Sequence, residues 1–249
     1  MKGFLFAMVI AAVAMSAAAG KPSKPAAKPK IKVLFMVGGG AHDFQSLPPI
    51  LKQRLEGTGD FAVTITEDRE KLTTLSRDGW HVALFYTQGG DLTPAQEKGL
   101  TDFVSSGRGY AGIHCASDSF KSSDAYFKLV GGQFSGHGYG TFTVKITARR
   151  HPITKGMADF EIEDETYNHE FYPQAKVQVL ARRATDQEPS VWVQNYGKGR
   201  VFYTGLGHGK EAFENPSFQM LMIRGISWAA GRPVPPLQPQ ACAQPKGAN

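Results

Sequence analysis

Histidine side chains stand at four points where an apolar, glycine-containing run ends. His42 follows "IKVLFMVGGG", His114 follows "GYAGI", His137 lies in "SGHGYG", and His208 ends "RVFYTGLGH". A neutral imidazole can bind a divalent metal, and it titrates near neutral pH, so it can also transfer protons. The acidic stretch "EIEDETYNHEFYP" adds the carboxylate of Glu165. These residue types predict a histidine/carboxylate pocket for a divalent metal or for acid–base chemistry on a hydroxyl-rich substrate.

No single histidine indicates a functional site, but the placement of four histidines after apolar runs does. A single histidine is usually a packing or loop residue held by a hydrogen bond. His81 begins an apolar run and His151 precedes a proline, so both are predicted to be structural. The other four are expected to share a pocket only if the fold brings strand ends together.

Apolar runs in the first half of the chain supply such strands. Four runs predict strands, at residues 31–40, 61–68, 81–90 and 109–116. Helix signals at 47–57 and 91–107 lie between them. The second helix has a capping box at Thr93 and Gln96 and a stop at Gly107. This alternation predicts an α/β fold whose mostly parallel sheet binds ligands at the carboxyl ends of its strands.

The second half of the chain has a different pattern. Residues 142–150 and 176–184 alternate between apolar and polar side chains, and 191–209 predict a hairpin that turns at Gly197. A final helix is expected over 216–231. These strands are predicted to be antiparallel additions to the parallel core.

The run "GYAGIHCASDSF" predicts a sharp turn after a strand. A nucleophile elbow places its reactive side chain in the middle of a small-x-Nuc-x-small turn. Between Gly112 and Ala116 that middle residue is His114, and Cys115 comes one residue late. Cys115 is therefore expected to pack inside the protein, which disfavours cysteine catalysis. No structural disulfide with Cys242 is expected.

Glycines and tyrosines near these histidines could contact a substrate. Gly89 and Gly90 would allow the backbone to approach a ligand closely, and Tyr139 and Tyr167 could stack on a sugar ring. The glycine-rich run at 36–44 has neither the spacing of a dinucleotide fingerprint nor the Lys-Ser/Thr of a P-loop. No nucleotide site is expected.

The ends of the chain differ in composition from its middle. We expect a signal peptide at 1–19, a Lys/Pro-rich spacer at 20–30, one domain at 31–231 and a Pro-rich disordered tail at 232–249. The formal net charge is +6, and five lysines lie in the first 30 residues, which contain no acid. The near-neutral remainder predicts no nucleic-acid partner. A periplasmic or secreted protein with no transmembrane segment after signal cleavage is expected.

Several motifs, in order along residues 31–231, resemble the ThuA-like family, which is named for trehalose utilisation. They are "GGGAHDF", "GGDLTPAQEKGLTDFVSSGRGYAGIHCASDSF", "LVGGQFSGHG", "HPITKGM", "EDETYN", "GKGRVFYTGLGH" and "FQMLMIRGISWAAG". The resemblance implies a class I glutamine amidotransferase-like, flavodoxin-like sandwich in which histidine replaces the amidotransferase cysteine. Glutamine amidotransferase activity is therefore not expected. The family often has proline where this chain has Gly138, which weakens the ligand role of His137.

The resemblance also implies a role in the catabolism of disaccharides or glycosides, including 3-keto sugars. We expect an enzyme that acts on small carbohydrates. Its reaction (hydrolysis, elimination or isomerisation) and the formation of a homo-oligomer are left open. The expected roles are catalytic for His114, Glu165 and His208, substrate-binding for His42, Gly89, Gly90, Tyr139 and Tyr167, and divalent-metal binding for His42, His114, His137 and His208. The alternatives are a non-catalytic carbohydrate-binding or scaffold module and, less favoured, a cysteine-dependent amidase.

Overall fold

The structure, a computed structural model, describes Met1, Gly3 and residues 29–237. The expected signal peptide, most of the expected spacer and the tail from residue 238 onward lie outside the described residues. Among the residues that are described, no helix is both long enough and apolar enough to cross a membrane.

A nine-stranded sheet forms the centre of the molecule, in the order β2-β1-β3-β4-β11-β10-β9-β6-β7. Its parallel block consists of β2 (Phe61–Thr66), β1 (Ile31–Gly38), β3 (Val82–Thr87), β4 (Gly109–Ile113) and β11 (Gly199–Thr204). Antiparallel strands continue the sheet, namely β10 (Pro189–Tyr196), β9 (Gln178–Arg183), β6 (Tyr139–Ile146) and β7 (Phe160–Glu165). This arrangement confirms the predicted α/β, flavodoxin-like class with antiparallel additions.

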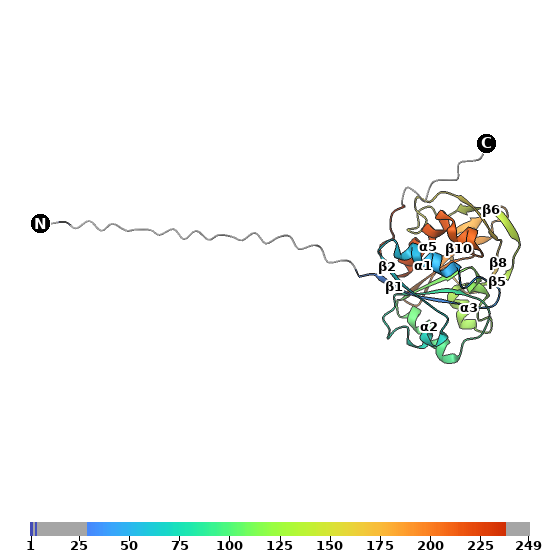
Figure 1. Ribbon diagram of the computed structural model, residues 1–249, viewed down its shortest axis with the longest axis horizontal. Coiled ribbons are helices and arrows are strands. Elements are labelled where there is room, and N and C mark those ends of the chain that lie inside the picture. Colours follow the sequence, from blue (N-terminus) through green and yellow to red (C-terminus); the bar gives the residue numbers. More distant parts are fainter. Residues whose placement is uncertain (2, 4–28, 238–249) are drawn as a thin grey trace, which may run out of the picture.

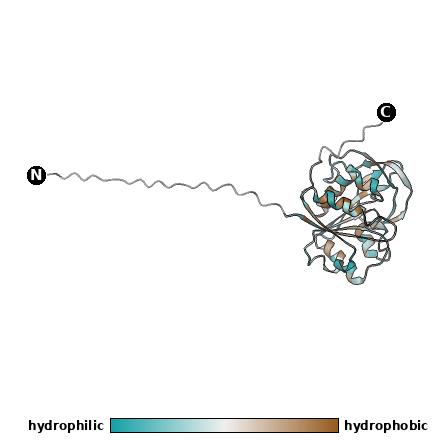
Figure 2. Ribbon diagram, viewed as in Figure 1, coloured by the Kyte–Doolittle hydropathy of each residue, from teal (hydrophilic) through white to brown (hydrophobic). Residues whose placement is uncertain are grey.

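Helices cover both faces of the sheet. Figure 1 shows α1 (Leu47–Glu56) and α5 (Pro216–Ala229) on one side, and α2 (Pro94–Ser105) and α3 (Asp124–Val130) on the other. A short helix, α4 (Lys210–Glu214), joins β11 to α5. The hydropathy colouring of Figure 2 marks brown apolar segments on the helices as well as on the strands.

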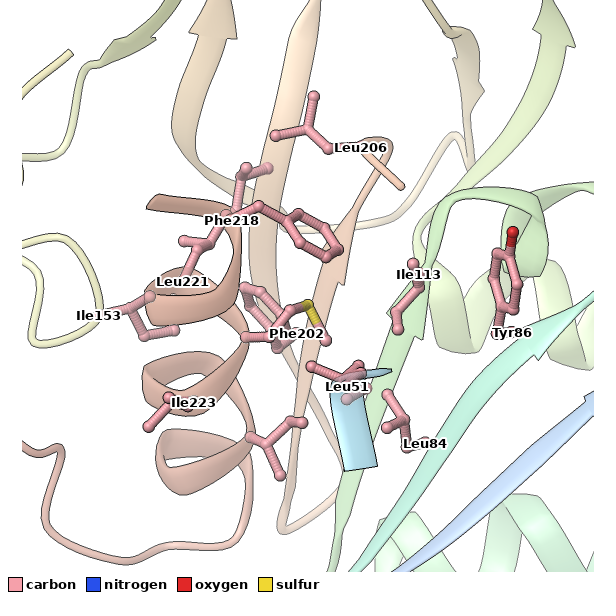
Figure 3. Close-up of a cluster of buried hydrophobic side chains, with 14 of the residues drawn as sticks. Leu51, Leu84, Tyr86, Ile113, Ile153, Phe202, Leu206, Phe218, Leu221 and Ile223 are labelled. Atoms are coloured by element: carbon pink, nitrogen blue, oxygen red, sulfur yellow. The ribbon is translucent and has the colours of Figure 1, made fainter. Parts of the chain in front are cut away.

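The strands of the parallel block are apolar throughout because both of their faces are buried. In β1, Val33 and Phe35 belong to the core that contains α1 and α5, whereas Leu34 and Met36 belong to the core beneath α2. Figure 3 shows the first core, where Phe202 of β11 lies beside α5. Burying each such side chain contributes about 1.5–3 kcal/mol to stability. Because successive side chains of a strand point to opposite faces, a strand that is apolar at every position is buried on both faces.

The predicted helix boundaries follow local signals closely. The capping box of Thr93 and Gln96 is present at the start of α2, and Gly107, with a φ of 118°, follows its end. The hairpin between β10 and β11 turns at Gly197, whose φ is 58°. Local sequence determines these features, so they could be predicted without the fold.

Other elements were not predicted. Among them are the seven-residue helix α3, the short helix α4, the acidic strand β7, and a two-stranded sheet formed by β5 (Gly132–Gly136) and β8 (Asn168–Phe171). The two paired strands are separated by more than thirty residues in the chain. Their pairing depends on long-range contacts, which short windows of sequence do not contain.

Candidate active site

The candidate site lies beyond the carboxyl ends of the parallel strands. His42 follows β1, His114 directly follows β4, and His208 follows β11, while Glu165 ends β7. The ring centroid of His42 lies 5.1 Å from the centroid of His114 and 5.1 Å from that of His208. The centroids of His114 and His208 are 5.5 Å apart. Residues that are far apart in the sequence therefore meet at the edge of the sheet where ligands of such folds bind.

His114 occupies a strained turn between β4 and a 3₁₀ segment at His114–Asp118. Its φ is 46°, a left-handed conformation that is uncommon for residues other than glycine. The imidazole has no exposed surface. Nδ1 of His114 lies 2.7 Å from the carbonyl oxygen of Gly205. Because a carbonyl only accepts, Nδ1 carries the hydrogen, and Nε2 is left with a lone pair in the neutral ring.

Cys115 faces away from this group of side chains. It is fully buried and belongs to the core that includes Ile113. Burial raises the pKa of its thiol well above the usual value. A nucleophilic cysteine needs a lowered pKa and access to the substrate, so this environment does not suit a cysteine nucleophile.

Glu165 lies between the imidazoles. Its Oε2 is 3.2 Å from Nε2 of His114, and its Oε1 is 3.2 Å from Nδ1 of His208 and 3.5 Å from Nδ1 of His137. Burial by itself would raise the pKa of Glu165, but the hydrogen bond to His114 and the nearby histidines outweigh it and lower that pKa. Glu165 is therefore a carboxylate at neutral pH.

His42 and His208 are both held in the neutral state. The pKa of His42 falls to about 4, chiefly because the ring is desolvated and also because His114 and His208 are close. Desolvation also lowers the pKa of His208, although Glu165 opposes that shift. Neutral imidazoles are the form that binds metal ions.

Four side chains could hold one metal ion. His42, His114, Glu165 and His208 each offer one ligand atom, and these atoms all lie within 4.8 Å of one another. Nε2 of His42 is buried without a hydrogen-bond partner, and so is Nδ1 of His208, whose 3.2 Å contact with Glu165 does not have the geometry of a hydrogen bond. His137, which the sequence places among the ligands, lies outside this group, and 44% of its side chain is exposed.

Asp164 supports the loop that carries His208, a role that sequence reasoning missed. Its carboxylate is buried and accepts hydrogen bonds from the backbone N–H groups of Gly207, at 2.7 Å, and His208, at 2.9 Å. Burial raises its pKa, and these hydrogen bonds and the proximity of His114 oppose the rise. The sequence pattern places Asp164 in the same acidic stretch as Glu165 but assigns the acid–base role to Glu165.

The two tyrosines expected to bind sugar occupy different environments. Tyr167 is buried, and its ring centroid is 3.7 Å from that of His114, so it packs on the histidine. Tyr139 is 59% exposed, its hydroxyl donates to Glu163, and its ring centroid is 6.3 Å from that of His208. Only Tyr139 offers an open aromatic face at the rim of the site.

A polar cavity of about 750 Å³ adjoins the histidines through Gln88. Its walls are formed by Gly39, Gly40, Arg69, Gln88, Gly89, Gly90, Asp91, Asp118, Lys121 and Ser122. Gly89 and Gly90, which were expected to approach a ligand, have φ values of 64° and 70° that favour glycine. A volume of this size lies within the roughly 300–1,000 Å³ of small-molecule sites.

The fold and the strained histidine turn define an α/β protein in which histidine takes the elbow position and the adjacent cysteine is buried. A sequence model of the ThuA family, described as trehalose utilisation, matches residues 32–229. The chain therefore belongs to the ThuA family. No curated protein matches its sequence.

Solved structures share this fold. A putative ThuA-like protein from Parabacteroides merdae is 21% identical, with a TM-score of 0.76 over 85% of this chain and 94% of that one. A second, from Bacteroides uniformis, is 21% identical, with a TM-score of 0.67 over 84% and 95% of the two chains. A β-galactosidase from a Rahnella species is 11% identical, with a TM-score of 0.58 over 83% of this chain and 33% of that chain. At these identities the likeness concerns the fold.

Proposed function

We propose that this protein is a carbohydrate-processing enzyme that acts on a disaccharide or glycoside, including 3-keto sugars, with a divalent metal in its histidine pocket. Membership of the ThuA family supports the carbohydrate substrate. The observation that carries the proposal is the meeting of His42, His114, Glu165 and His208, whose ligand atoms lie within 4.8 Å of one another.

The contact between His114 and Glu165 depends on what lies between the two side chains. Because Nδ1 of His114 donates to Gly205, Nε2 has a lone pair when the ring is neutral, and it lies 3.2 Å from Oε2 of Glu165. Two acceptors at that distance repel each other unless a proton or a metal ion lies between them. Three imidazoles and one carboxylate form a donor set that suits Zn²⁺ and related divalent ions. Such an ion would polarise a carbonyl or hydroxyl oxygen of the substrate as a Lewis acid.

The protein residues supply proton transfer and orientation. Glu165 is ionised at neutral pH, so its second carboxylate oxygen, the one that would not bind the metal, could accept a proton from a substrate hydroxyl and return it. The adjoining cavity offers the backbone of Gly89 and Gly90 to the rest of the substrate. Tyr139 at the rim can stack on a sugar ring.

Export to the periplasm or the medium is part of the proposal. Its support is the sequence alone, where Lys2 precedes an apolar run that ends in Ala17–Ala19. Protein recovered from the periplasm or medium of an expressing bacterium should begin at Gly20. Retention of the whole chain in the cytoplasm would contradict this part without affecting the assignment of the pocket.

A non-catalytic carbohydrate-binding module is the second candidate. The observations that favour it are the open polar cavity beside Gln88 and the exposed ring of Tyr139 near His208, features that binding proteins also use. The buried thiol of Cys115 disfavours the third, a cysteine-dependent amidase.

Metal analysis together with a sugar screen tests the proposal. Purified protein should hold about one divalent ion per chain, and His114→Ala and His208→Ala should each lower metal content and turnover of the sugar that stabilises the protein most. His151→Ala is the matched control, because His151 packs against Trp228 away from the pocket. Sugar-dependent stabilisation without metal or turnover would establish the binding module instead.

A further inference from the structure

Gln88 lies immediately after β3 and its side chain contacts three neighbours. Its Oε1 accepts a hydrogen bond from the backbone N–H of Ala41 at 2.9 Å and lies 3.3 Å from Nδ1 of His42. Its Nε2 donates to the carboxylate of Asp118 at 3.1 Å. Sequence reasoning assigned no role to this residue, although it stands directly before Gly89 and Gly90.

These partners determine which way the amide of Gln88 points. The N–H of Ala41 can only donate and the Asp118 carboxylate can only accept. Rotating the amide by half a turn would oppose two donors at Ala41 and two acceptors at Asp118. Lys121, whose Nζ is 2.6 Å from Oδ1 of Asp118, forms an ion pair with that carboxylate and helps to hold it in place.

The orientation of the amide also determines the tautomer of His42. Because Oε1 of Gln88 has no proton to give, the hydrogen between it and His42 must belong to Nδ1 of the imidazole. Nε2 of His42 is then left with its lone pair, and it is buried without a hydrogen-bond partner. A buried nitrogen without a partner is costly unless it binds a ligand.

We infer that Gln88 is a positioning residue that holds His42 in the Nδ1–H tautomer and so directs the Nε2 lone pair to the pocket. The tautomer assignment does not depend on the proposed function, whereas the binding of a metal ion by Nε2 of His42 does. Outer hydrogen-bond partners of metal-binding histidines commonly fix the tautomer in this way. His114 has the same arrangement, with the carbonyl of Gly205 as its partner.

The same amide connects the pocket to the adjoining cavity. Gln88, Asp118 and Lys121 all line that cavity, whereas His42 belongs to the histidine group. Polar contacts of 2.6, 3.1 and 3.3 Å therefore connect Lys121, Asp118, Gln88 and His42 in turn, from the cavity wall to a candidate metal ligand. Gln88 is positioned between the two compartments and touches both.

The first test measures the tautomer directly in metal-free protein. Long-range ¹⁵N–¹H NMR at pH 8 distinguishes the protonated ring nitrogen of a histidine from the bare one, and the His42→Asn variant identifies the His42 signals. Wild-type protein should show Nδ1 protonated and Nε2 bare. A protonated Nε2 in wild-type protein overturns the inference, and this measurement needs no variant of Gln88.

The second test separates positioning from packing. Gln88→Met retains the length of the side chain and removes its acceptor, so the Nδ1–H preference should be lost and Co²⁺ affinity should fall roughly 10- to 100-fold. Gln88→Glu combined with Asp118→Asn keeps an acceptor oxygen for Nδ1 of His42 and lets the new amide donate to the new carboxylate, so this pair should restore the tautomer. An unchanged tautomer and unchanged Co²⁺ affinity in folded Gln88→Met protein overturn the inference. Absence of carbohydrate turnover in wild-type protein would instead count against the proposed function and leave the tautomer result standing.

Discussion

The hydroxyl of Tyr203 donates a hydrogen bond of 2.7 Å to the carbonyl oxygen of His114, the residue with a φ of 46°. The same hydroxyl lies 2.7 Å from Oγ of Ser117 and 3.2 Å from Nε2 of His169. All of these groups are buried or nearly so. A conformation that costs roughly 1–3 kcal/mol is thus held by a hydrogen bond from a neighbouring strand.

Removing this hydroxyl should loosen the turn. Tyr203→Phe removes the shorter of two hydroxyl hydrogen bonds to the buried His114 carbonyl, the other being from Ser117 at 3.2 Å, and we expect a loss of about 1–3 kcal/mol in the free energy of unfolding. Urea denaturation measures the loss. Tyr172→Phe is the control, because its hydroxyl bonds to Asp124 at an exposed position, and its effect should stay within about 0.5 kcal/mol. Equal effects of the two variants would contradict a special role for Tyr203.

Replacing Asp164 should affect the loop that carries His208. Asp164→Asn keeps the size of the side chain but turns one acceptor oxygen into a donor, which then faces a backbone N–H of Gly207 or His208. We expect a loss of about 1–3 kcal/mol in stability and weaker Zn²⁺ binding, measured by denaturation and by competition with a chelator. Unaltered Zn²⁺ affinity in a folded variant would show that the loop does not need this anchor.

Sequence patterns predicted the parallel core because its strands and helix caps are local features. They also predicted that histidines at strand ends would meet, since the carboxyl ends of parallel strands share one edge. The role of Asp164 was missed although β7 carried a signal: Phe160, Ile162 and Asp164 alternate with exposed residues and share the buried face. A buried acid on an alternating strand indicates a structural anchor. Gln88 gave no such signal, because its role comes from three tertiary contacts.

Glu165 should be essential to both metal binding and turnover. Glu165→Gln removes the negative charge that lies among three histidines, and we expect turnover to fall about 10²- to 10⁴-fold, the range of acid–base groups. Glu161→Gln is the matched control, because Glu161 is an exposed glutamate of β7 that lies four residues away. Steady-state kinetics on the stabilising sugar, with metal content measured in parallel, would refute the assignment if the two variants behaved alike.

Acid should destabilise the metal-free protein through His42. The pKa of His42 is about 4 when folded, below the 6.5 of the unfolded chain, so the unfolded state binds more protons between those values. The contribution of His42 to the free energy of unfolding is therefore fully present above pH 6.5 and is lost as the pH falls toward 4. Because the ring is partly exposed and solvent weakens the effect, we expect this contribution to be about 2 kcal/mol, less than the full pKa shift would give.

A variant isolates this contribution from other titrating groups. His42→Asn removes the ionisation, so the difference in unfolding free energy between wild-type and variant protein should change by about that amount between pH 4 and 6.5 and be constant above pH 6.5. Urea titrations of chelator-treated protein at several pH values provide the measurement. A difference that does not vary with pH would show that His42 is not held neutral.

Cys115 should be dispensable for activity although it follows the elbow histidine. Its side chain is fully buried, and burial raises its pKa, so alkylation of the native protein by iodoacetamide should be slow until the protein unfolds. Cys115→Ala removes one buried atom, which should cost about 1 kcal/mol in stability and leave metal content and turnover within about twofold of wild type. Mass spectrometry of the peptide that contains Cys115 follows the alkylation. Rapid modification of native protein together with loss of turnover in Cys115→Ala would instead restore the cysteine as the reactive group, because a thiol that reacts quickly must be both accessible and ionised.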